Sequence, residues 1–237
     1  MALNTVPTHP SADSYVSKAE ADAILANRIG VTDWTARTDD EKEALLKLAT
    51  AQIDSFRFFG EKIFKFAKNY RDEQALQFPR DNKPTISGTA DSATATSLVD
   101  AALASNTNYP DDFFNGWAIV IIEGTGRGQT IAITDFVSAT GALTVAAWTV
   151  QPDSTSQYLL VPKIPQKVKL AVVEQALYLT KGGGDRARLQ AEGVTEYKIG
   201  DLMEKFGGAN MSAGKVAISN EARGYLTGLI TRLGRII

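Results

Sequence analysis

The sequence predicts an α+β protein, in which a discontinuous, mainly helical domain carries an inserted small all-β domain, either a barrel or a sandwich. Apolar residues recur at helical spacing near both ends of the chain, whereas the middle holds β-branched runs separated by glycine. Charge is uneven as well: residues 1–83 hold 12 Lys/Arg and 13 Asp/Glu, residues 84–161 hold 1 and 7, and residues 162–237 hold 12 and 7. We therefore expect three segments.

The middle segment, residues 84–161, is interpreted as the inserted β domain. Its composition, rich in Thr, Ser, Ala and Gly with a single arginine, differs from both neighbours. Residues 1–83 and 162–237 would then form the two parts of one helical domain. Prolines mark the two junctions: Pro79, Pro84, Pro162 and Pro165.

The first flank predicts two helices that begin with capping boxes, at residues 17–20 and 38–41. The first helix would run to about Arg28. The second would end before Gly60, and its apolar stripe needs a packing partner. This stripe consists of Leu45, Leu48, Ala49, Ile53 and Phe56.

The second flank predicts a central helix, a strand or hairpin arm, and a C-terminal helix. The helix that starts at Pro165 is apolar on almost every side, which is typical of a buried helix. Residues 193–200 alternate as a strand or hairpin would. A small-residue linker at 207–214 precedes an amphipathic helix from about Asn220, so residues 219–237 are expected either to dock on a neighbouring molecule or to pack on their own domain.

Four runs within the middle segment predict strands: residues 117–122, 129–134, 142–146 and 157–161. A short helix is expected at 97–105. The glycine-rich stretch 124–128 joins two predicted strands and lacks the lysine and hydroxyl of a phosphate-binding loop, so we interpret it as a hairpin turn rather than a nucleotide site.

The residue types argue against a catalytic function. The chain has no cysteine, and its single histidine, His9, lies near the N-terminus; this removes thiolate chemistry and the usual serine-activating base. The acidic pair Asp111–Asp112 and the run 39–41 fit a turn and a helix start better than a carboxylate active site. We predict no catalytic, cofactor-binding or metal-ligating residue and no enzyme. No apolar stretch is long enough for a membrane span, and no secretory signal precedes the domain, so synthesis in a cytosol is expected.

Several short segments, taken in order, carry a family resemblance: Ser14–Val16 with the following helix, Trp34, Gln74–Arg80, Ile164–Pro165 and Gly193–Asp201. Together they resemble phage head-tail connector (adaptor) proteins, a group also labelled DnaT-like ssDNA-binding proteins. Phe78 stands where tryptophan is expected. The inserted domain is similar to a small β module of phage structural proteins.

The resemblance implies a structural virion protein of the bacteriophage neck, made in the host cytoplasm. Such proteins form a homo-oligomeric ring, usually a dodecamer, between the portal protein and the tail or its stopper or terminator protein. Genome DNA would pass through the ring without sequence-specific contact, and the acidic insert would lie at the outer rim. The implied portal or neighbour contacts are Tyr225, Leu226, Leu229, Ile230, Arg232, Leu233 and Arg235.

The alternative function takes the ssDNA-binding label literally. The net charge of residues 162–237, +5 from 12 basic and 7 acidic residues, would contact phosphates. That flank has no dense basic run interleaved with aromatic residues, which a stacking platform requires. The sequence therefore favours the connector.

Overall fold

The computed structural model describes residues 2–181, 189, 194, 196–199, 202–205 and 218–231. Its helices are α1 (Lys18–Leu25), α2 (Thr32–Thr35), α3 (Asp39–Asp54), α4 (Gln166–Thr180) and α6 (Asn220–Tyr225), with a 3-10 turn at Ala101–Leu103. Its strands are β1 (Ile86–Thr89), β2 (Ser92–Thr94), β3 (Ser97–Val99), β4 (Ala118–Glu123), β5 (Thr130–Val137), β6 (Ala142–Val145), β7 (Gln157–Val161), β8 (Glu196–Ile199) and β9 (Leu202–Lys205).

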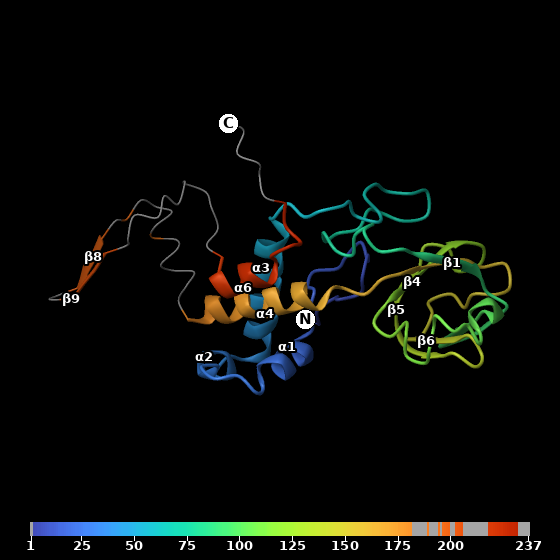
Figure 1. The fold of residues 1–237 in the computed structure, drawn as a ribbon, viewed down its shortest axis with the longest axis horizontal. Helices are drawn as coiled ribbons and strands as arrows, with labels where there is room; N and C mark the ends of the chain where they lie inside the picture. The colour runs from blue at the N-terminus through green and yellow to red at the C-terminus, as the bar shows by residue number, and fades with distance from the viewer. Residues whose placement is uncertain are drawn as a thin grey trace.

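The prediction of a mainly helical adaptor domain with a small β insert is wrong. The largest element of the described chain is a seven-stranded antiparallel sheet, and the helices form a smaller part beside it (Figure 1). Two segments account for the error. Residues 55–83, assigned to the helical flank, form an extended loop, and the predicted helix at 97–105 is strand β3 followed by one 3-10 turn.

The seven strands follow the order β1-β7-β4-β5-β6-β3-β2, and every neighbouring pair is antiparallel. The four strands predicted from β-branched runs are confirmed as β4 to β7. Strands β1 to β3 were missed. Tyr158 is buried at the centre, where its hydroxyl donates to Asp100 Oδ2 at 2.5 Å. Burial and this carboxylate raise the pKa of Tyr158, so the phenol stays protonated.

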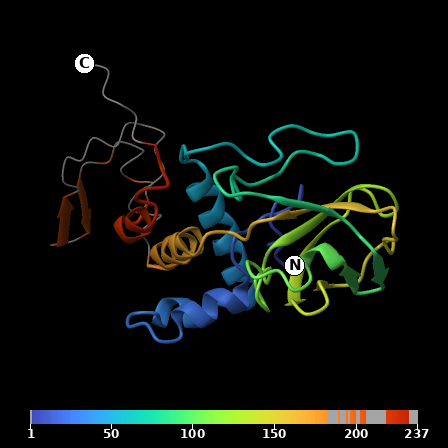
Figure 2. The same ribbon diagram turned by 45° about the vertical axis from the view of Figure 1, so that its right-hand side comes forward.

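The helical part has its own core, in which α3 and α4 pack together and α1, α2 and α6 surround them (Figure 2). Both predicted capping boxes are present, at Ser17 and Thr38. The prediction of a buried central helix is confirmed, because most side chains of α4 are inaccessible. Strands β8 and β9 form a separate two-stranded antiparallel sheet at the predicted hairpin.

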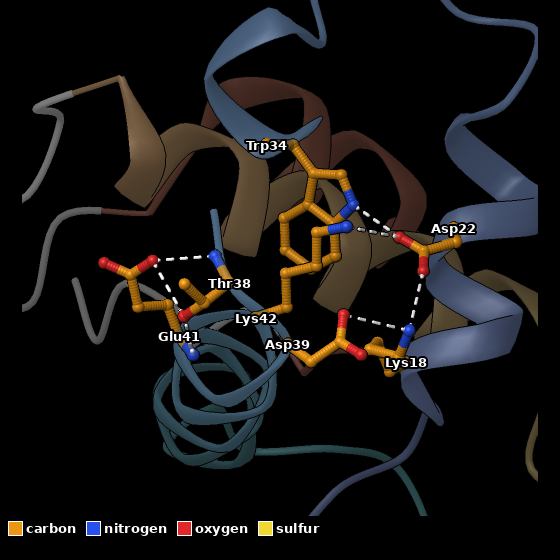
Figure 3. A network of polar contacts seen from close by, with 7 residues as sticks. All are labelled: Lys18, Asp22, Trp34, Thr38, Asp39, Glu41 and Lys42. Atoms are coloured by element: carbon orange, nitrogen blue, oxygen red, sulfur yellow. Dashed lines mark hydrogen bonds and ion pairs between the residues drawn. The ribbon is translucent and has the colours of Figure 1, made fainter. Parts of the chain in front are cut away.

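A polar network around Asp22 joins the first three helices (Figure 3). The Asp22 carboxylate accepts from Trp34 Nε1 at 2.8 Å and lies 3.3 and 3.4 Å from the ammonium groups of Lys42 and Lys18. Partial burial raises the pKa of Asp22, but these donors outweigh burial, and its pKa lies below the usual value. Lys18 also contacts Asp39 at 3.1 Å, which ties α1 to the start of α3.

Residues 55–83, called the long loop below, attach the sheet to the helical part. Phe64 packs against β4 and β7 in an apolar cluster with Ala118, Val120 and Val161, which is separate from the helical core. Arg71, only 7% exposed, stacks over Phe64 with its guanidinium 3.9 Å from the ring centroid. The same guanidinium donates to the Thr8 carbonyl and, at 3.3 Å, to the Thr130 hydroxyl on β5. Arg71 thus bridges the N-terminal segment, the loop and the sheet.

The C-terminal helix is shorter than predicted. Helix α6 ends at Tyr225, and Gly228 adopts a φ of 85° in the turn that follows, a conformation that favours glycine. Leu229 and Ile230 therefore lie beyond the helix. Ile230 forms an isolated antiparallel bridge with Phe58 of the long loop.

Candidate nucleic-acid interface

The long loop begins with an unusual composition. Residues 56–68 contain five phenylalanines, four Lys/Arg and one acidic residue. The loop turns at Gly60, where φ is 74° and Glu61 N donates to Asp81 Oδ1 at 2.8 Å. Aromatic and basic side chains thereby lie on both sides of one turn.

Arg80 binds the backbone of this turn. Its guanidinium donates to the Phe59 carbonyl at 2.7 Å, to the Gly60 carbonyl, and to the Gln77 side-chain oxygen at 2.8 Å. Burial lowers the pKa of Arg80, yet nearby carboxylates oppose this shift. These bonds use the arginine to fix the loop backbone, so Arg80 shapes the site.

A second buried network supports the loop where it returns. The Tyr15 hydroxyl donates to Asp54 at the end of α3 and accepts from Phe78 N at 3.1 Å, while Gln77 N donates to Asp54 Oδ2 at 3.0 Å. Burial raises the pKa of Tyr15 and of Asp54. The backbone at 77–78 is therefore fixed relative to both the N-terminal segment and α3.

Four of the five phenylalanines fall into two sets, one buried and one exposed. Phe58 is buried and packs edge-to-face on Phe78, with ring centroids 4.7 Å apart, and Phe64 is buried against the sheet. Phe59 and Phe66 point outward, with 51% and 67% of their surface exposed. Large exposed aromatic rings on a rigid backbone are available for stacking.

Basic groups accompany the exposed rings. Lys65 Nζ lies 5.4 Å from the Phe66 ring centroid and 2.8 Å from Glu61 Oε1. Lys62 Nζ donates to the backbone carbonyls of Gln74 and Ala75 at 3.1 and 3.2 Å, so this half-buried lysine also holds the loop backbone. Arg57 is exposed and forms no ion pair with a described residue.

Phe59, Arg57, Lys62 and Lys65 line an open cleft of about 560 Å³, and Phe66 lies on the same loop outside this lining. Its charged lining is four basic residues and one acid: Arg57, Lys62, Lys65, Arg80 and Glu61. Thr231 closes one side, since its N–H and hydroxyl donate to the Arg57 carbonyl at 2.8 and 3.1 Å. A basic cleft with an exposed aromatic ring, and a second exposed ring on the same loop, suits a polyanion that carries flat bases.

None of the predicted portal contacts within the described residues lines this cleft. Leu226 is fully buried in the helical core, and Tyr225, Leu229 and Ile230 are partly buried against it. Arg232, Leu233 and Arg235 lie outside the described residues. Residues 219–237 were expected either to dock on a neighbouring molecule or to pack on their own domain. Residues 219–231 pack on their own domain, and the portal contact stays a prediction.

The described residues hold no cluster of three or more His, Cys, Asp or Glu side chains that could bind a metal ion. None of their helices has the length and apolar character needed to cross a membrane.

Residues 124–128 form the turn between β4 and β5, as predicted. The guanidinium carbon of Arg127 lies 5.2 Å from the ring centroid of Tyr70 in the long loop.

Residues 1–109 match a family model described as "Putative DnaT-like ssDNA binding protein". The match spans α1 to α3, the whole long loop and β1 to β3, which is less than half of the 237 residues. Comparison with curated proteins finds no match. The family description agrees with the ssDNA-binding label of the group that the sequence resembles, and it provides no support for a connector role.

The basic and aromatic run of the cleft is hidden in the charge of the whole first flank. Residues 1–83 are balanced, since the acidic starts of the helices cancel the basic loop. A count over residues 56–68 alone would have given +3 with five aromatic residues.

Proposed function

We propose that this protein binds single-stranded nucleic acid in the cleft formed by the long loop. The observation that carries the proposal is the exposed Phe59 ring, which lines the basic cleft, together with a second exposed ring, Phe66, on the same basic loop. Bases of a single strand stack on such rings in any sequence, while lysines and arginines contact the phosphates. The family description of residues 1–109 supports the same function.

The proposal is tested by fluorescence anisotropy with a labelled 15-mer of deoxythymidine over a range of salt concentrations. Removing one stacked ring costs about 1–3 kcal/mol, so Phe59→Ala and Phe66→Ala should each weaken binding about 5- to 150-fold. Lys65→Ala should lower the slope of log K against log salt by about 0.7, the value for one phosphate contact on a single strand.

Matched controls lie away from the cleft. Leu48 is an apolar residue, 49% exposed on α3, and Lys167 is an exposed lysine on α4. Leu48→Ala and Lys167→Ala should leave both the affinity and the salt dependence unchanged. Binding that is absent, or that is equally weakened by the control and cleft variants, would contradict the proposal.

A second candidate function is the ring connector of the phage neck, which would place the protein in the virion with portal and tail partners. Uncovered apolar side chains support an assembly of this kind: Ile29 is 97% exposed, and Leu48 borders a groove of about 300 Å³ between α3 and the end of α4. Light scattering and electron microscopy of the purified protein test it. A closed oligomer that Leu48→Asp disrupts is expected, and a monomer at high concentration would exclude it.

A further inference from the structure

A second open cleft, of about 420 Å³, lies where the chain enters and leaves the sheet. Lys83 borders it on the entering side and Lys163 on the leaving side, and the turn that precedes β4 forms its wall. Both lysines are exposed, and neither forms an ion pair with a described residue. Two cations are thus available beside this turn.

The wall of the cleft carries an aromatic platform. Phe113 is 36% exposed and lies 5.8 Å from Trp117, with the two rings tilted by 39°. Behind them, Phe114 contacts both rings edge-to-face, at 5.0 and 5.3 Å, and is itself fully buried. The platform is therefore held by the core of the sheet.

Trp117 has an unused donor. The indole N–H of Trp34 donates to Asp22 and that of Trp148 to the Ser97 carbonyl, whereas the N–H of Trp117 has no acceptor among the described residues. Trp117 is only half-buried, so its indole N–H can donate to a ligand in the cleft. An open donor beside exposed aromatic surface and two lysines favours a ligand that combines flat rings with acceptor oxygens.

The same turn also supplies acceptors. Asp111 Oδ1 accepts from Ser138 N at 2.7 Å, and Asp112 Oδ1 accepts from Asn115 Nδ2 at 2.8 Å. The other oxygen of each carboxylate accepts no hydrogen bond from a described residue. Carboxylates accept from the amino groups of bases, such as N4 of cytosine. The two lysines offset the two carboxylates, so the cleft has no net charge.

The two clefts are close along the chain. Arg80 lines the first and Lys83 the second, and three residues span at most about 11 Å even when fully extended. We infer that a single strand bound in the first cleft continues into the second, where Phe113 and Trp117 stack a further base and the lysines contact its phosphates. This inference rests on the proposed function, and it extends the site beyond the residues that match the family model.

The test uses the full chain and a 15-mer of deoxycytidine. Phe113→Ala should weaken binding about 5-fold or more, the loss of one stacked base. Val137→Ala is the matched control, since Val137 is a 39% exposed apolar residue on β5, and it should change nothing. Melting curves followed by circular dichroism establish that both variants are folded.

Tryptophan fluorescence gives an independent measurement that does not need Phe113→Ala to fold. Trp34 and Trp148 are buried, so quenching on addition of the 15-mer should come from Trp117 and disappear in Trp117→Phe. If Phe59→Ala weakens binding while Phe113→Ala does not, or quenching persists in Trp117→Phe, the second cleft is excluded and the first remains. If the wild-type protein binds no oligonucleotide, the proposed function itself fails.

Discussion

Replacing Arg71 with alanine should loosen the attachment of the sheet to the helical part. The substitution removes the donors to the Thr8 carbonyl, the Asp72 carbonyl and the Thr130 hydroxyl, together with the stack on Phe64. Hydrogen bonds from a charged donor contribute about 1.5–3 kcal/mol each. Burial lowers the pKa of Arg71 to about 10, which shows that the cation bears a desolvation cost offsetting part of this sum. We expect a net loss of about 3 kcal/mol.

Thermal and urea unfolding measure this loss. At this chain length, about 3 kcal/mol corresponds to a fall in Tm of about 6–12 °C. Far-UV circular dichroism and tryptophan fluorescence should give one shared transition in the wild-type protein and separated transitions in Arg71→Ala, because the two parts then unfold independently. Arg57→Ala, at an exposed position, is the control and should stay within about 0.5 kcal/mol. Coincident transitions with an unchanged midpoint in Arg71→Ala would refute this account of the interface.

Two further predictions concern the local structure. Because the folded-state pKa of Asp22 lies below the ordinary value of 3.8, the ion pairs stabilise the fold above that pH, and this stabilisation is lost as the pH falls through the folded-state pKa. Asp22→Asn should therefore cost about 1 kcal/mol in urea unfolding at pH 7, and this cost should shrink as the pH is lowered below 3.8; a cost independent of pH would exclude the network. Gly128 has a φ of 92°, and an added Cβ would lie 2.4 Å from the Tyr70 carbonyl oxygen, so Gly128→Ala should lower the stability by about 2–4 kcal/mol. Gly224→Ala is its control in α6, where a Cβ meets nothing within 4 Å and the change should be neutral or stabilising; a neutral Gly128→Ala would contradict the close approach.

How far the sequence predicted the fold depended on side-chain periodicity. Strands β4 to β7 carry β-branched and aromatic residues, and α1, α3 and α4 carry capping or apolar patterns, so these elements could be predicted. Strands β1 to β3 are short and contain mainly Ser, Thr, Ala and Gly, and their pairing with β7 and β6 depends on contacts between distant residues. Local pattern contains no information about such pairing.

The candidate site was harder to predict because its backbone is irregular. The direction in which Phe59 points depends on Arg80, which lies 21 residues further along the chain and binds the loop carbonyls. A sequence shows that residues 56–68 are basic and aromatic, but not which rings are buried. Similarly, Gly228 was visible within the predicted C-terminal helix, and its role in the turn after α6 emerged only with its positive φ.

Different phenylalanines of the long loop attach it to the rest of the protein and face solvent. Phe58 and Phe64 face inward and hold the loop on the helical core and the sheet, whereas Phe59 and Phe66 face outward beside the lysines. Replacing an inward ring with alanine should therefore cost about 3–5 kcal/mol of stability, while replacing an outward ring should change stability by no more than about 0.5 kcal/mol. If the outward rings serve nucleic acid, their variants should retain the wild-type melting temperature and lose affinity. A loop that served attachment alone would show no loss of affinity in either set of variants, so the two sets together separate attachment from binding.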